Sequence, residues 1–146
     1  YLGPGFSNEY VKIFLDTNLL IYSVDPSNKT KQAIAKTALK KCTTHHQGVI
    51  STQVLQEFYV ACTKKIGISA LETKELMNFF CNFETILITP DHIENAIDCS
   101  VLHDLSFWDA LIIASAQSAK CSQVWTEDLT HKQTIQGVQI INPFTP

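Results

Sequence analysis

Four acidic residues stand beside segments whose apolar pattern predicts burial: Asp16, Glu57, Asp109 and Asp128. A carboxylate that is buried without a partner is costly. Several carboxylates at one edge of a sheet repel one another strongly unless a cation lies among them. Hard divalent cations such as Mg²⁺ and Mn²⁺ take carboxylate and water oxygens as ligands. The residue types therefore predict a site for Mg²⁺ or Mn²⁺, on condition that the fold brings the four acids together.

Each acid also has a purely structural interpretation. Asp16 could cap the helix that follows it, and Asp128 could shape a turn. Glu57 could reach solvent from the flank of its helix. Asp109 and Ser106 match a capping box, and an acid in the first turn suits the helix dipole. The metal prediction therefore rests on the four acids jointly and on none of them singly.

Short apolar strands alternate with helices along the chain. The strands are expected at residues 11–16, 48–51, 85–88, 122–125 and 138–141. Short continuous apolar strands separated by helices indicate a parallel sheet covered on both faces, which is an α/β sandwich. Ligand sites in such folds lie outside the carboxyl ends of the strands, at a topological switch point. Asp16 ends the first expected strand, and Asp128 follows the expected strand at 122–125, in "TED".

Capping signals mark the starts of the helices. They are Ser51 or Thr52 for the helix that carries Glu57, "SALE" at 69–72, Thr89 followed by Pro90, and Ser106 for "SFWDALIIASAQSA". Ser and Thr side chains accept hydrogen bonds from the free backbone N–H groups of a first turn, and Pro suits that turn. The last segment is apolar almost all round, which predicts a central helix. A short helix is also expected from about residue 18 to 24.

The charge pattern bears on nucleic-acid binding. The 146 residues carry 11 basic and 14 acidic side chains, a net charge of −3, and every basic residue is a lysine. Without arginine there is no bidentate fork for phosphate, and only point-charge contacts remain. The lysines cluster at Lys29, Lys31, Lys36, Lys40 and Lys41, and again at Lys64 and Lys65. The first cluster falls on an amphipathic helix with Ala33, Ile34, Ala38 and Leu39 inward. For such clusters a solvated helix face is favoured over a nucleic-acid rim.

Length and residue usage restrict the remaining possibilities. We expect one domain at 11–146, preceded by a flexible N-terminal segment or a cloning remnant at 1–10. The five cysteines are odd in number and form no C-x-x-C pair, which is typical of reduced thiols in the core of a cytoplasmic protein. No apolar run approaches the roughly 20 residues of a membrane helix. The histidines lack zinc spacing, and no serine-hydrolase, P-loop or dinucleotide motif occurs.

Four blocks of the sequence resemble a PIN domain, particularly the small VapC-type ribonuclease toxins. They are "IFLDTNLLIY", "STQVLQEFYV", "LSFWDALIIASA" and "WTEDLTHKQTIQGVQIINPF". They occur in family order and span residues 11–144. The resemblance implies a PIN-like three-layer α/β/α sandwich with a central, mainly parallel sheet. It also implies that the family's catalytic, metal-binding acids correspond to Asp16, Glu57, Asp109 and Asp128.

The resemblance assigns supporting roles to three more residues. Thr17 and Asn18 match the polar pair after the first acid, where a hydroxyl and an amide could support the metal site. Thr126 matches a threonine two residues before the last acid, where it could hydrogen-bond a carboxylate or a metal-bound water. Some family members carry a further acid near the last one, whereas this chain has Thr130 and His131 there.

The activity implied by the resemblance is hydrolysis of an RNA phosphodiester bond by water, assisted by one or two Mg²⁺ or Mn²⁺ ions. Family members are commonly homodimers, and the toxins pair with a small antitoxin whose tail blocks the acidic groove. Two alternatives stay open: a stand-alone PIN nuclease in RNA processing or decay, and a non-catalytic PIN-like scaffold that binds RNA or protein. A haloacid-dehalogenase-like phosphatase is disfavoured because it needs a second Asp where this chain has Asn18.

Overall fold

Six strands form one sheet within residues 10–146, the part of the chain that the computed structural model describes. They are β1 (Lys12–Leu15), β2 (Gln47–Ser51), β3 (Glu84–Ile86), β4 (Gln123–Trp125), β5 (Thr134–Ile135) and β6 (Val138–Ile141). Their order across the sheet is β3-β2-β1-β4-β6-β5. Every neighbouring pair is parallel except β5 and β6.

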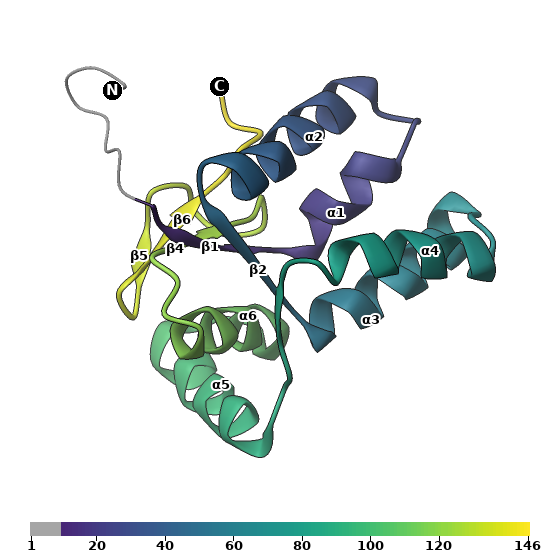
Figure 1. The fold of residues 1–146 in the computed structure, drawn as a ribbon. Helices are drawn as coiled ribbons and strands as arrows, with labels where there is room; N and C mark the ends of the chain where they lie inside the picture. Colours follow the sequence, from purple (N-terminus) through teal and green to yellow (C-terminus); the bar gives the residue numbers. More distant parts are fainter. Residues whose placement is uncertain (1–9) are drawn as a thin grey trace.

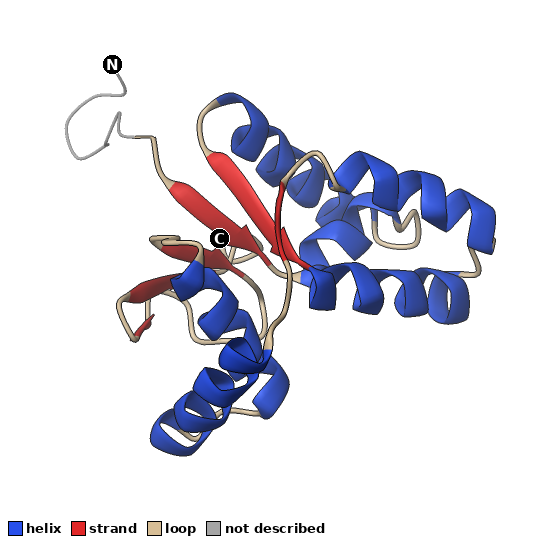
Figure 2. Cartoon of the chain, turned by 60° about the horizontal axis from the view of Figure 1, so that its bottom comes forward, coloured by secondary structure: helices blue, strands red, loops and turns tan. Residues whose placement is uncertain are grey.

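Helices cover both faces of this sheet. They are α1 (Thr17–Val24), α2 (Lys29–Thr44), α3 (Thr52–Ala61), the π-helix η1 (Cys62–Ile66), α4 (Ala70–Phe80), α5 (Pro90–His103) and α6 (Phe107–Ser118). Helix α6 packs on β4, β6 and α5, whereas α2 packs on β2. The α5–α6 pair lies on one side of the sheet and α2 on the other (Figures 1 and 2). The prediction of a three-layer α/β/α sandwich with a mainly parallel sheet is confirmed.

The strand order creates a switch point beside β1. The chain passes from β1 to β2 and β3 on one side, and α5 and α6 then carry it back to β4 on the other side of β1. Leu15 of β1 pairs with Trp125 of β4 at the carboxyl ends of the two strands. The loops after β1 and β4 therefore leave the sheet side by side, in the crevice where such folds bind ligands. Helix α3 begins directly after β2 at the same edge.

The core is built from the apolar strands and the buried faces of the helices. Helix α6 buries seven consecutive residues from Ala110 to Ala116, as the pattern of a central helix predicts. A close approach occurs at Gly48 of β2, where an added Cβ would lie 2.7 Å from Phe83 Cδ1 and 3.1 Å from Leu15 Cδ1. Interiors are packed to the density of organic crystals, so only glycine fits between these two side chains.

The expected caps form at the starts of the helices. Ser51, rather than Thr52, caps α3, and Ser106 caps α6. Thr89 and His92 form a reciprocal capping box at the start of α5. Each cap satisfies a backbone N–H that has no partner inside its helix. The cap of α6 also fixes the turn from which Asp109 projects.

Two details of the fold differ from the sequence-based expectation. Helix α2 buries the i, i+3, i+4, i+7 stripe Ala35, Ala38, Leu39 and Cys42, whereas Ala33 is exposed because it lies off that stripe. Strand β5 is not predicted from the sequence because it has only two residues. It pairs with β6 through Gln136 and Gly137, which both have positive φ, of 50° and 82°. Positive φ at both central residues is the geometry of a tight two-residue hairpin.

The remaining expectations concern cysteines, the N-terminus and membranes. All five cysteines are free thiols, and four are buried, but Cys81 is exposed because it caps the end of α4. The prediction of a core position is therefore wrong for Cys81. The segment expected to be flexible, residues 1–10, lies outside the described residues except for Tyr10. Within residues 10–146, no helix combines the length and apolar character needed to cross a membrane.

Candidate active site

Asp16 stands at the switch point because β1 ends there. Its backbone N–H donates to Trp125 O at 3.1 Å, which places it beside the end of β4. Its side chain is buried: the residue is 7% exposed. One carboxylate oxygen, Oδ1, accepts from Thr17 N at 2.7 Å, and the other, Oδ2, accepts from Thr126 Oγ1 at 2.7 Å. The first of these bonds makes Asp16 the N-cap of α1, so capping and a place at the switch point occur together.

Thr126 connects Asp16 to Asp128. It is almost fully buried, and its backbone N–H donates to Ile141 O on β6 at 3.0 Å. Its hydroxyl donates to Asp16 and accepts from Asp128 N at 3.1 Å. Asn18 Nδ2 donates to Asp128 Oδ2 at 2.8 Å. The start of α1 and the loop after β4 therefore hold each other in position through polar contacts.

Glu57 reaches the same place from α3. It accepts a hydrogen bond at Oε1 from Thr17 Oγ1 at 3.2 Å. Desolvation raises the pKa of Glu57 even though the residue as a whole is exposed, and the Thr17 and Gln53 hydrogen bonds lower it. Repulsion from Asp109 and Asp128 also raises the pKa. Glu57 is thus within electrostatic reach of acids from α6 and from the loop after β4.

Asp109 comes from the first turn of α6. Its backbone N–H donates to Ser106 Oγ at 3.1 Å. Within the described residues its carboxylate makes no hydrogen bond back to Ser106, so the capping box is only half formed. Burial is the larger cause that raises the pKa of Asp128, and repulsion from Asp109, which also acts on Glu57, raises it further. Four segments that are distant in the sequence therefore bring their acids into mutual repulsion.

The carboxyl group of Asp16 has the largest shift among these acids. Burial raises the pKa of Asp16 to about 6, against the hydrogen bonds from Thr126 and Thr17, which favour the charged form. Repulsion from Asp128 and Glu57 raises it further. A carboxylate in this position requires positive charge nearby if it is to stay ionised. Within residues 10–146 no lysine is paired with any of the four acids.

The donor set fits a hard divalent cation in its chemistry, because it consists of carboxylates with hydroxyl and amide neighbours. The side chains as they lie do not form a closed ligand cage: among residues 10–146 no three His, Cys, Asp or Glu side chains meet closely enough to hold a metal ion. The hydrogen bonds explain this spread. Asn18 holds Asp128, and Thr17 holds Glu57, each in a separate orientation. Mutual repulsion favours the same separation.

Three other polar residues are close to these acids in the sequence but have different surroundings. Glu127 forms an ion pair with Lys31 at 2.7 Å and accepts a hydrogen bond from Tyr22, so it turns away from Asp128 as strand alternation predicts. Asp104 ends α5 in the left-handed conformation, with φ 53°. His131 accepts a backbone hydrogen bond through Nδ1 at 2.9 Å.

A groove adjoins the acids, with a volume of about 510 Å³. We call it the acid groove. Its lining includes Thr17, Asn18, Gln53, Glu57, Val60, Ala61, Lys64, Lys65 and Trp108. The sequence prediction does not include Gln53, Lys64, Lys65 or Trp108 in the site. The sequence does contain a signal for Gln53 and Lys64. Gln53 lies four residues before Glu57 and Lys64 lies seven residues after it, and this helical spacing places them on the same helix face as Glu57. Trp108 directly precedes Asp109.

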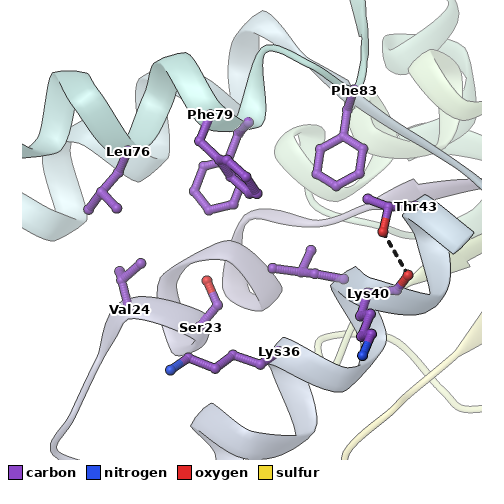
Figure 3. Close-up of a pocket in the computed structure, with 10 residues that line it drawn as sticks. Ser23, Val24, Lys36, Lys40, Thr43, Leu76, Phe79 and Phe83 are labelled. Carbon is purple, nitrogen blue, oxygen red and sulfur yellow. Dashed lines mark hydrogen bonds between the residues drawn. The ribbon is translucent and has the colours of Figure 1, made fainter.

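A second, more apolar hollow lies away from the acids, between α1, α2 and α4. It has a volume of about 380 Å³. Figure 3 shows Leu76, Phe79 and Phe83 on one wall, facing Val24 and Thr43. Phe79 is largely exposed. This hollow contains none of the four acids.

Comparisons with known proteins identify the family of the chain and agree with its fold. A model of the PIN domain matches residues 13–135. No curated protein matches the chain. A toxin–antitoxin complex from Klebsiella pneumoniae contains a chain of similar fold, with TM-score 0.67 and 24% identity over 90% of this chain and 98% of that one. The sarcin–ricin loop cleaving toxin VapC20 of Mycobacterium tuberculosis has TM-score 0.64 and 19% identity over 77% and 86%. DNA-bound VapBC of Salmonella typhimurium has TM-score 0.65 and 19% identity over 89% and 96%.

Proposed function

Because the chain belongs to the PIN domain family, we propose that it is a Mg²⁺- or Mn²⁺-dependent endoribonuclease and the toxin of a toxin–antitoxin pair. The observation that carries this proposal is the convergence of Asp16, Glu57, Asp109 and Asp128 on one switch point. They repel one another there, and no lysine in the described part of the chain pairs with them. Carboxylates that repel one another are unfavourable unless a cation lies among them, so we do not expect a non-catalytic scaffold to retain all four. The similarity to a sarcin–ricin loop cleaving toxin and to toxin–antitoxin complexes gives further support.

The four acids would hold one or two ions, and such ions would lower the pKa of a water molecule and offset charge on the phosphoryl group. The protein's own groups prepare these acids. Thr126 and the N–H of Thr17 stabilise the ionised form of Asp16. Asn18 orients Asp128, and the Thr17 hydroxyl orients Glu57. One of the acids then orients or deprotonates the attacking water, and hydrolysis leaves a 5′-phosphate and a 3′-hydroxyl.

The partners follow from the same proposal. A small antitoxin would bind the protein and cover the acidic site, and the functional form would be a homodimer in the cytoplasm. The similarity to toxin–antitoxin complexes supports the first partner. The apolar hollow between α1, α2 and α4 offers surface that a partner could cover. Co-purification of a small protein encoded next to this gene would distinguish the toxin from a stand-alone nuclease.

The central prediction concerns cleavage of a structured RNA pool by the purified protein. We expect cutting with Mg²⁺ or Mn²⁺ and none with EDTA. Asp16→Asn, Glu57→Gln, Asp109→Asn and Asp128→Asn should each lower the rate by at least about a hundredfold, as for other residues that act as a unit at a site. End-group analysis of the fragments should give 5′-phosphates.

Asp104→Asn is the matched control, because it removes a nearby acid at a left-handed position that asparagine tolerates. Its activity should equal that of the wild type. Equal cleavage by wild type and Asp16→Asn would mean that a contaminant or another site cuts the RNA. Calorimetry with Mn²⁺ tests the non-catalytic scaffold: no heat of binding and no cleavage would favour it.

A further inference from the structure

The acid groove is lined by residues of opposite charge. Thr17, Asn18 and Glu57 of the candidate active site lie along it. Lys64 and Lys65 line it as well; both are exposed, and neither forms an ion pair within the described residues. A negatively charged ligand that reached the acids through this groove would therefore pass two lysines that have no protein carboxylate to bind.

The two lysines belong to the π-helix η1, which continues α3 without a break. It ends at Gly67, whose φ of 85° turns the chain away. Short π-helical segments inside or beside α-helices occur frequently at functional sites because they change the direction of side chains. Here the wider turn follows the helix that carries Glu57, and both lysines line the groove next to it.

Trp108 also lines the groove. It is 62% exposed, in contrast with the other tryptophan, Trp125, which is 9% exposed. Its position is fixed: the ring packs edge-on against Phe107 with centroids 5.0 Å apart, and its carbonyl accepts from Gln53 Nε2 at 3.3 Å. A large aromatic ring that is anchored through its backbone, yet open to solvent, presents a face on which a base can stack.

Gln53 is a further polar residue that lines the groove. It is 4% exposed, and because its Nε2 faces Trp108 O, its Oε1 orientation is determined. This oxygen is buried and has no hydrogen-bond partner within the described residues. Buried acceptors without partners are rare and require an explanation. A bound group with a hydrogen-bond donor in the groove would satisfy it.

Taking the proposed RNA-cleaving function as its basis, we propose that the acid groove binds a nucleotide of single-stranded RNA next to the cleavage site. Trp108 stacks on the base, and Lys64 and Lys65 contact flanking phosphates. Trp108 is then a positioning residue that presents the RNA backbone to the acids. Stacking on an aromatic ring tolerates any base, so selection of a particular target must come from contacts outside this groove.

Binding of a fluorescein-labelled 12-nucleotide oligo(U) RNA tests this proposal, measured by anisotropy in Mg²⁺. The parent is Asp16→Asn, which keeps the RNA intact. Trp108→Ala should weaken binding by roughly five- to a hundredfold, and Trp108→Phe should retain most of the affinity. The double variant Lys64→Gln, Lys65→Gln should reduce the slope of log K against log salt by about 0.7 for each lysine that contacts phosphate. Lys120→Gln, at the opposite end of α6, is the matched control and should change neither quantity.

The fluorescence of Trp108 gives an independent signal. In a Trp125→Phe variant, Trp108 is the sole tryptophan, and oligo(U) should quench its emission and protect it from acrylamide. Two results would overturn the stacking proposal. One is an affinity of Trp108→Ala equal to that of the parent, and the other is an equal loss of affinity in Trp108→Ala and Trp108→Phe. If either result accompanies metal-dependent cleavage by the wild type, the nuclease proposal stands alone. If the parent binds no RNA and the wild type cuts none, both proposals fail.

Discussion

At the scale of single residues, the buried carboxyl group of Asp16 makes stability depend on pH. Its folded-state pKa of about 6 lies above the ordinary value of 3.8, so the native state holds the proton more tightly than the unfolded chain. The resulting stabilisation is fully present below about pH 4 and is lost as the pH rises through 6. It amounts to about 3 kcal/mol for a shift of this size.

The corresponding variant is Asp16→Asn, which cannot ionise. Relative to the wild type, its free energy of unfolding in EDTA should increase by up to about 3 kcal/mol between pH 4 and pH 7.5. Urea unfolding at several pH values measures this difference. Asp25→Asn is a suitable comparison, because hydrogen bonds from Ser27 lower the pKa of Asp25, so its contribution to stability depends on pH with the opposite sign. A difference that does not vary with pH would show that Asp16 is ionised without cost.

The sequence predicts some residues of the site better than others. Asp16 ends an apolar strand, and this contrast is visible in the sequence. The role of Thr126 as a donor to Asp16 requires the pairing of β1 with β4, which no local pattern contains. Gln53 and Trp108 meet because α3 and the start of α6 lie together. Such a contact between distant helices is a property of packing and not of spacing along one helix.

At the scale of elements, the contact between β2 and the segment after α4 depends on Gly48. Gly48→Ala would place a methyl group 2.7 Å from the Phe83 ring, and overpacking of this kind typically costs about 1–3 kcal/mol. We expect a lower midpoint of urea unfolding at an unchanged slope. Adding Phe83→Leu should recover part of the loss, since it removes the ring that clashes. No loss in Gly48→Ala alone would mean that Phe83 moves without cost.

Elements with a strong local signal are predicted well. The strands at β1, β2, β4 and β6 and the capped helices match the sequence pattern to within a residue or two. Strand β5 is not predicted because its two residues carry no periodicity. The hairpin is indicated only by the turn at Gln136 and Gly137. The buried stripe of α2 is displaced because alanine, which is frequent in this helix, marks buried and exposed positions alike.

At the scale of the whole molecule, repulsion among the four acids predicts a divalent-ion effect on folding. An ion that binds only the native state stabilises it by RT ln(1 + [L]/Kd), or about 2.7 kcal/mol at a hundred times Kd. In a chain of this size, that should raise the melting temperature by roughly 5 °C or more. Mg²⁺ and Mn²⁺ should both have this effect, and NaCl at equal ionic strength should not. In Asp16→Asn, Asp109→Asn the shift should disappear; its persistence would place the ion elsewhere.

The strand order is the part of the architecture that the pattern of residues leaves open. Alternating strands and helices specify a parallel sheet, but they do not say that the fourth strand returns to the far side of β1. The resemblance to the PIN domain predicts a mainly parallel sheet in three layers, and the strand order itself comes from the structure.

The switch point also has a consequence for synthesis of the chain. The carboxylates come from residues 16, 57, 109 and 128, and the hydroxyl that holds Asp16 comes from residue 126. A ribosome releases these groups in order. A nascent chain that ends before residue 126 therefore has three of the acids but lacks the fourth acid, which follows strand β4, and the hydroxyl that holds Asp16. If the protein cleaves RNA, its own translation machinery and message meet no competent site until most of the polypeptide has emerged and folded.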